Sequence, residues 1–296
     1  MHRPVLLKEV LDIFSPKSGE TYIDATANGG GHLLAIAEKI GPTGKILGID
    51  RDCELVAKLK EKINKLKIEN VELICDNFAN ITARARRHHL AKIDGILFDL
   101  GFSSYHIEES GRGFSFLKDE PLDMRYNPAE TIESAAAILS KWPEQKIEKI
   151  LLEYGEERFA KNIAKEIAER RFKSKIQRTG DLVKIIRQAV PAWYCRRKTH
   201  CATKTFQALR IAVNNELQNV EKAIRAASEI LSPCGKLIVI SFHSLEDRIA
   251  KRLFKERQAA GQVVVINKKV IRPTRDEIRA NSKARSAKLR AVQKSL

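Results

Sequence analysis

The chain has 296 residues, five cysteines and a formal net charge of +17 at pH 7. A chain of this length can bury a substantial core without the support of disulfides or structural metals. An odd cysteine count without regular spacing favours reduced thiols over a disulfide framework. The first residues lack a long apolar core and a small-residue cleavage site, and no apolar run approaches the about 18 residues of a membrane span. We therefore expect a cytoplasmic protein that is neither secreted nor membrane-spanning.

The positive charge is concentrated in two segments. Residues 170–210 hold twelve Lys or Arg against one acidic residue, and residues 268–296 hold ten against two. Charge focused in this way favours a polyanionic partner, in particular a nucleic acid. The alternative is a generally basic, soluble surface.

The first hundred residues alternate apolar strands with helical patterns. Alternation of this kind requires a parallel sheet whose strands are joined by right-handed crossovers. The predicted strands are TYIDATA, KILGID, VELICD and IDGILFDLG, and the predicted helices between them include HLLAIAEKI and CELVAKLKEKINKL.

The strand pattern stops between 104 and 214, where a loop-rich stretch and then helical spacing follow, as at Ile147, Ile150 and Leu151. One long helix is predicted over 205–231, followed by strands in KLIVISF, QVVVINKK and SAKLRAVQK. The fold class is therefore α/β. Seven strands, split four and three, form a mostly parallel sheet over 1–103 and 215–296, and 104–214 form an inserted α-helical domain.

Acidic residues follow the predicted strands, at Asp24, Asp50, Asp76 and Asp99, and a glycine turn, GGGH at 29–32, follows the first strand. Ligands of open α/β sheets bind at this edge. A dinucleotide would bring a pyrophosphate into a ring of carboxylates, whereas S-adenosylmethionine carries positive charge and no phosphate. We therefore expect S-adenosylmethionine, although any single Asp here could instead be a helix N-cap or turn residue.

Eight sequence blocks, in order along the chain, point to one family. They are HRPVLLKEV, GGGH, DGILFDLGFSS, RGFSF, PLDMR, YGEER, TFQALRIAVNNEL and ISFHSLEDR. Together they closely resemble the RsmH (MraW) family of methyltransferases. The resemblance implies methylation of N4 of a cytosine in the decoding region of 16S ribosomal RNA, with S-adenosylmethionine as cofactor and the RNA or the small ribosomal subunit as partner. It also implies a class I (Rossmann-like) core interrupted by a helical domain that engages the RNA.

The resemblance also implies cofactor contacts, to which the residues themselves add Asp24. The full set is Asp24, Gly30, Gly31, His32, Asp50, Phe78, Asp99 and His106. The family usually has Gln at position 106. Further departures are Asn28, Cys201 and Lys204, where Gly, Pro and Arg are usual.

Cytosine N4 is a poor nucleophile because its lone pair is delocalised, so the site must orient the amine and accept its protons. Asp99 is the first candidate for this role, with Ser103 and His243 as further acceptors and Phe102 as a stacking surface. Ser103 could instead shape the turn, and a histidine after a buried strand could be a structural partner.

RNA contacts are predicted in two loops and in a motif that places aromatic beside basic residues, WYCRRKTHC. The candidates are Arg112, Arg125, Trp193, Arg196, Arg197, Lys198 and Lys204. A metal at Cys195, His200 and Cys201 would lack a second ligand pair, so no metal is expected. Two alternatives stay open, namely methylation of DNA or protein by the same core, and a non-catalytic ribosome-assembly factor.

Overall fold

The computed structural model describes residues 4–101, 103–130 and 132–296. It contains two compact units, Met1–Phe102 with Leu217–Leu296, and Ser103–Glu216. These boundaries lie within two residues of the domain limits expected from the sequence. Nowhere in the three described ranges is a helix both long enough and apolar enough to cross a membrane.

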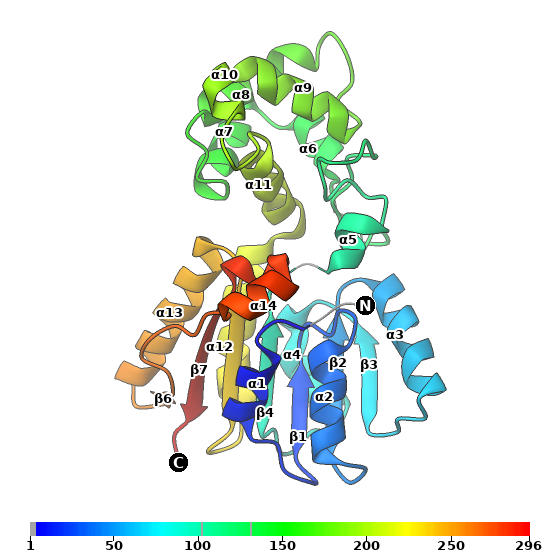
Figure 1. Ribbon diagram of the computed structural model, residues 1–296, viewed down its shortest axis with the longest axis vertical. Helices are drawn as coiled ribbons and strands as arrows, with labels where there is room; N and C mark the ends of the chain where they lie inside the picture. The colour runs from blue at the N-terminus through cyan, green and yellow to red at the C-terminus, as the bar shows by residue number, and fades with distance from the viewer. Residues whose placement is uncertain (1–3, 102, 131) are drawn as a thin grey trace. The chain divides into compact units, whose positions relative to one another are not determined.

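The first unit is built on a seven-stranded sheet with the order β3-β2-β1-β4-β5-β7-β6 (Figure 1). Neighbours from β3 to β5 pair in parallel, whereas β7 is antiparallel to both β5 and β6. The predicted mostly parallel sheet, with four strands before the insertion and three after it, is confirmed. The strands are β1 (Thr21–Asp24), β2 (Lys45–Asp50), β3 (Val71–Cys75), β4 (Gly95–Asp99), β5 (Lys236–Ser241), β6 (Val263–Val265) and β7 (Lys288–Lys294).

Helices cover both faces of this sheet. Residues of α1, α2 and α3 join the core on one face, and residues of α4, α12 and α13 join the core on the other. Helical spacing explains this burial, as in α3, where Leu55, Leu59 and Ile63 face inward. The helices of this unit are α1 (Leu7–Phe14), α2 (Gly31–Ile40), α3 (Cys53–Lys65), η1 (Phe78–Asn80), α4 (Ile81–Arg87), α12 (Glu216–Ile230), α13 (Ser244–Ala259), α14 (Arg275–Ala280) and η2 (Ser282–Ser286).

The second unit is helical and has its own core, in which Ile147, Ile150 and Leu151 are buried as their spacing predicts. An isolated β-bridge joins Pro121 and Arg178. The helices are α5 (Ser104–Glu108), α6 (Ala135–Lys141), α7 (Glu144–Glu153), α8 (Ala160–Arg170), α9 (Thr179–Ala189), α10 (Ala192–Cys195) and α11 (Thr203–Asn214).

The prediction of a single helix over 205–231 is wrong at its centre, where the structure has two helices. Between α11 and α12, Asn215 adopts the left-handed conformation, with φ 52° and ψ 39°. Asparagine tolerates this region better than most residues. The side-chain amide of Asn214 also donates to the carbonyl oxygens of Met124 at 2.7 Å and Arg210 at 3.0 Å, which fixes the end of α11.

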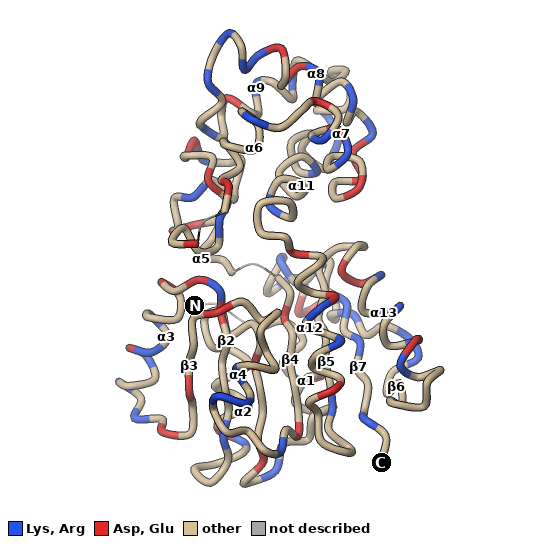
Figure 2. The backbone as a smooth tube through the Cα atoms, turned by 180° about the vertical axis from the view of Figure 1, so that it is seen from behind, with Lys and Arg blue, Asp and Glu red and all other residues tan. Residues whose placement is uncertain are grey.

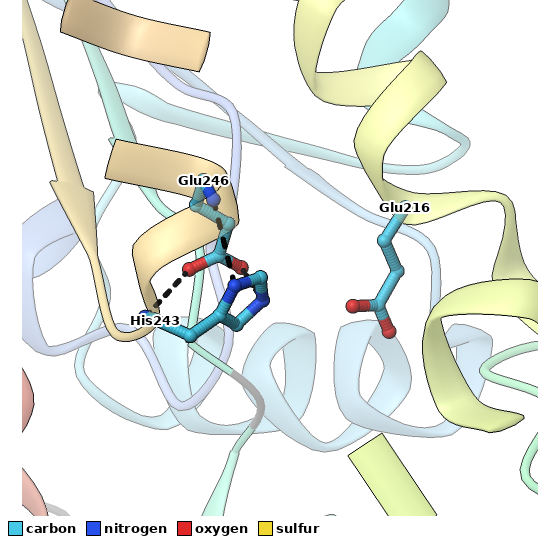
Figure 3. Close-up of side chains that lie close together, drawn as sticks. All are labelled: Glu216, His243 and Glu246. Carbon is cyan, nitrogen blue, oxygen red and sulfur yellow. Dashed lines mark hydrogen bonds and ion pairs between the residues drawn. The ribbon is translucent and has the colours of Figure 1, made fainter. Parts of the chain in front are cut away.

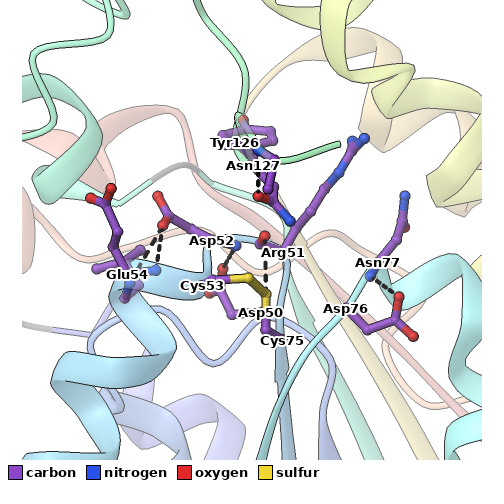
Figure 4. Close-up of a disulfide and its surroundings, with 12 residues drawn as sticks. Asp50, Arg51, Asp52, Cys53, Glu54, Cys75, Asp76, Asn77, Tyr126 and Asn127 are labelled. Atoms are coloured by element: carbon purple, nitrogen blue, oxygen red, sulfur yellow. Dashed lines mark hydrogen bonds between the residues drawn. A yellow bond between two sulfur atoms is a disulfide. The ribbon is translucent and has the colours of Figure 1, made fainter. Parts of the chain in front are cut away.

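The expectation of reduced thiols is wrong for four of the five cysteines. Cys53 pairs with Cys75, and Cys195 pairs with Cys201, while Cys234 is a free, exposed thiol. The first disulfide joins the start of α3 to the end of β3 (Figure 4). Its two cysteines are 22 residues apart, so their approach depends on the pairing of β2 with β3 and cannot be seen in local spacing.

Candidate functional site

The glycine turn after β1 begins α2 at the carboxyl edge of the sheet. Gly30 has a φ of 80°, which favours glycine, and Asn28 has a φ of 47°, a conformation that Asn accepts. A Cβ atom on Gly31 would lie 2.9 Å from Cβ of Pro4. The turn is therefore packed directly against the segment that precedes α1.

Three of the predicted carboxylates, Asp24, Asp50 and Asp99, are buried where β1, β2 and β4 end. Thr26 links two of these strand ends, because its amide donates to Asp24 and its hydroxyl oxygen accepts the amide of Asp99 at 2.6 Å. The carboxylate of Asp50 accepts the amides of Asn28 at 2.7 Å and Asp52 at 2.9 Å. Asp50 therefore holds both the glycine turn and the start of α3.

Electrostatics make two of these acids unusual. Burial, and then the negative charge of Asp50, raises the pKa of Asp24 from 3.8 to about 7. Burial, and then the charges of Asp24 and Glu246, raises the pKa of Asp99 from 3.8 to about 8. Oδ1 of Asp99 is buried without a hydrogen-bond partner among the described residues. A positively charged ligand would stabilise the ionised forms of both carboxyls.

His32, predicted in the cofactor loop, is buried in α2 and lies beside Asp99. Its Nδ1 is 3.6 Å from a carboxylate oxygen of Asp99, and its Nε2 is 2.9 Å from the carbonyl oxygen of Val5. Since a carbonyl oxygen can only accept, Nε2 carries a proton. His32 therefore connects the segment before α1 to the carboxyl cluster.

His243 and Glu246 begin α13 directly after β5 and form a capping box (Figure 3). One oxygen of Glu246 accepts the amides of Phe242 at 2.9 Å and His243 at 3.3 Å, while the other is 3.1 Å from Nε2 of His243. These contacts give His243 a clear structural role in starting the helix. Its predicted function as a proton acceptor stays a prediction.

Phe78 follows β3 in the short helix η1, where it packs edge-on against Phe98 at 5.8 Å between ring centroids. Asp76 precedes it and accepts the amide of Asn77 at 2.7 Å, with both residues close to the Cys53–Cys75 disulfide (Figure 4). Asp76 thus shapes a turn, which is the alternative role given above for an Asp at the end of a strand.

In the second unit, Ser103 and His106 form the capping box of α5. The hydroxyl of Ser103 accepts the amide of Tyr105 at 3.2 Å, and Nδ1 of His106 accepts the amide of Ser103 at 3.1 Å. Glutamine at this position of a capping box can accept the same amide. The ring of His106 is buried against Phe114 and Tyr126, at 5.0 Å from each. The predicted stacking residue Phe102 lies outside the described residues.

Arg112 and Arg125, two predicted RNA contacts, are engaged within the second unit. The guanidinium of the buried Arg112 donates to the carbonyl oxygen of Tyr126 at 2.6 Å. Arg125 donates to both carboxylate oxygens of Asp123, at 2.8 and 2.7 Å. Burial alone would raise the pKa of Asp123, but the adjacent Arg125 holds that pKa below its ordinary value. These arginines stabilise the loop that carries RGFSF and PLDMR.

The remaining predicted RNA contacts differ in how exposed their side chains are. Lys204 donates to the carbonyl oxygen of Glu156, whereas Trp193 is half-exposed and 196–198 are exposed. The disulfide Cys195–Cys201 closes the loop that carries these three basic residues. Other Lys and Arg positions recur along α8 and α9 of the same unit (Figure 2).

Residues 1–295 match the protein family described as the MraW methylase family. The chain belongs to this family. Three curated relatives carry the name ribosomal RNA small subunit methyltransferase H. The Heliobacterium modesticaldum relative is 45% identical and covers 99% of this chain and 98% of its own length. The corresponding figures are 44%, 99% and 97% for Dictyoglomus thermophilum, and 42%, 99% and 98% for Clostridium botulinum strain 657.

In this member of the methylase family, sequence reasoning left the roles of two parts of the site unrecognised. One is the segment before α1, where Pro4 packs on Gly31 and Val5 accepts from His32. The other is Glu246, whose place directly after the fifth predicted strand the block ISFHSLEDR indicates, but whose charge beside Asp99 and capping of α13 come only from the structure. Glu three residues after His243 is a capping signal that could have shown the role of Glu246, whereas no local pattern in HRPVLLKEV indicates that Pro4 and Val5 contact the glycine turn and His32.

Proposed function

We propose that the chain transfers the methyl group of S-adenosylmethionine to N4 of a cytosine in the decoding region of 16S ribosomal RNA, and that it does so in the cytoplasm. Membership of a methylase family and the names of its relatives support this reaction class. The observation that carries the proposal is the buried cluster of Asp24 and Asp99 beside a glycine turn, because it favours a cationic ligand.

The residues of the first unit fit S-adenosylmethionine. This cofactor supplies a methyl group activated by a positively charged sulfur. Asp24 and Asp99 would face its cationic groups, and the unpartnered Oδ1 of Asp99 is an acceptor ready for such a ligand. Asp50 would bind ribose hydroxyls, and Gly31, which has no side chain, leaves the turn room to pack closely.

Asp99 is our candidate for handling the amine proton. Its amide is anchored to Thr26, so the carboxylate has a fixed position at the end of β4. A positive charge beside it would favour the ionised form, which can accept a hydrogen bond from the amine and then its proton. Ser103 and His243 remain further candidates for orienting the amine.

The helical unit is our candidate for RNA recognition. Trp193 offers an exposed aromatic face for stacking, and the guanidinium of Arg158 lies over its ring at 5.8 Å. Exposed Arg196, Arg197 and Lys198 next to it suit phosphate contacts. Phosphate contacts would position the RNA, whereas base contacts would select the cytosine.

Mass spectrometry of 16S ribosomal RNA tests the proposal. RNA from cells that lack the protein should lack one N4-methylcytosine, and the wild-type gene should restore it. Asp99→Asn should fail to restore the modification, while a matched variant at an exposed carboxyl of α1, Asp12→Asn, should restore it. An unchanged methylation pattern in the deleted cells would overturn the proposed substrate. Calorimetry that shows binding of NAD and none of S-adenosylmethionine would overturn the reaction.

A further inference from the structure

The chain between β6 and β7 returns to the same edge of the sheet as the carboxyl cluster. Because β7 is antiparallel to β5, its first residue Lys288 pairs with Ser241 at the carboxyl end of β5. Asp99 pairs with Ile240, one residue earlier on the same strand. The residues immediately before Lys288 therefore lie at the edge where β1 and β4 end. We call residues 271–287 the carboxy-terminal arm.

The arm is folded onto the first unit and is not a loose tail. Glu277 accepts the amide of Leu6 at 2.7 Å, which ties α14 to the segment before α1 (Figure 1). Ile271 forms a β-bridge with Leu289, and the side chains of Ala284 and Ala287 are buried in the core. The cations of the arm are therefore presented from a fixed backbone.

Five of the basic side chains in and next to the arm form two groups. Arg290 and Lys288 contact Asp247, at 2.7 Å and 3.3 Å, and therefore join β7 to α13. Arg272, Arg275 and Arg285 are exposed, and none of them makes an ion pair or side-chain hydrogen bond with another described residue. The two acids of the arm are also occupied, since Glu277 binds Leu6 and Asp276 pairs with Arg279.

We propose that Arg272, Arg275 and Arg285 form a phosphate-binding surface for RNA on the first unit itself. The proposal rests on the proposed function, because a substrate RNA must bring its target amine to the edge that holds Asp99. Phosphates that flank the target would then pass this edge, where three uncompensated guanidinium groups stand on an ordered segment. Guanidinium groups bind phosphate with two parallel hydrogen bonds, which suits this role.

The test compares two triple variants that remove equal charge from opposite edges of the sheet. The arm variant carries Arg272→Gln, Arg275→Gln and Arg285→Gln. The control carries Lys39→Gln, Arg86→Gln and Arg87→Gln, which are exposed residues at the ends of α2 and α4, just before β2 and β4 begin. Affinity for a 16S ribosomal RNA fragment is measured over a potassium chloride series, together with affinity for S-adenosylmethionine.

Removal of one arginine–phosphate interaction should reduce the slope of log affinity against log salt by about 0.7 to 0.9. The slope of the arm variant should therefore be shallower by up to about two to three units, while the control keeps the wild-type slope and both keep the cofactor affinity. Equal slopes for the arm variant and the wild type, or equal reductions in both variants, would overturn the proposal. Wild-type methylation of the same fragment is read separately, so a failure of the proposed function is distinguished from a failure of the arm.

Discussion

Asp99→Asn removes the ionisable group but keeps the shape of the side chain, because an amide has nearly the shape of a protonated carboxyl. In the folded protein without cofactor, the pKa of Asp99 is about 8, whereas its ordinary value is 3.8. Between these values the folded state holds a proton that the unfolded state has released. The free energy of unfolding must therefore fall as the pH rises from 3.8 to about 8. Above the folded pKa, Asp99 is ionised in both states and the decline ends.

The magnitude follows from the proton count. One extra proton bound by the folded state lowers the unfolding free energy by about 1.4 kcal/mol for each rise of one pH unit. Asp24, with a pKa of about 7, acts in the same direction. The difference in stability between Asp99→Asn and wild type should thus grow by about 4 kcal/mol from pH 5 to pH 8, in favour of the variant.

Urea unfolding of the protein without cofactor, at half-unit steps from pH 5 to pH 9, measures this difference. The comparison with wild type cancels the titrating groups that do not interact with Asp99. Asp12→Asn, at an exposed carboxyl of α1, controls for the removal of one acidic residue. Parallel stability curves for wild type and Asp99→Asn would refute the argument that Asp99 is buried in its neutral form.

Three further outcomes are expected. Binding of S-adenosylmethionine near pH 7 should release protons from Asp24 and Asp99, so the apparent enthalpy in calorimetry should depend on the ionisation enthalpy of the buffer. Gly31→Ala should weaken cofactor binding with little change in helical circular dichroism, because its methyl group would meet Pro4 at 2.9 Å. Asp247→Asn should lower the unfolding free energy by about 1 to 3 kcal/mol, measured in urea, because β7 loses its charged hydrogen bonds to α13.

The sheet could be predicted because its strands are continuous apolar runs, and the ends of such a run in the sequence mark the ends of the strand. The positions of Asp24 and Asp99 followed, since parallel strands bring their carboxyl ends to one edge. Pairings between distant segments could not be predicted. The contact of Val5 with His32 and the disulfide Cys53–Cys75 exist only once the sheet has aligned their elements.

The error in the helix over 205–231 has a local physical cause. The spacing of apolar residues continues across Asn215, so periodicity predicts one helix. The left-handed conformation of Asn215 ends α11 there, although the apolar spacing does not change. The strand predicted in SAKLRAVQK, which contains Lys288 and Arg290, is confirmed as β7, but the contacts of these two cations with Asp247 on α13 could not be predicted from their positive charge. Only the folded structure distinguishes a cation that holds the fold from one that faces water.

The strand order has a consequence for how the protein is made. β7 is the final strand in the chain, yet it lies between β5 and β6 and bonds to both. During synthesis the first four strands leave the ribosome long before the strand that completes the interior of the sheet, and β5 and β6 must wait with unpaired edges. A premature stop that removes only β7 would therefore leave a gap within the sheet, and we expect such a product to aggregate or be degraded.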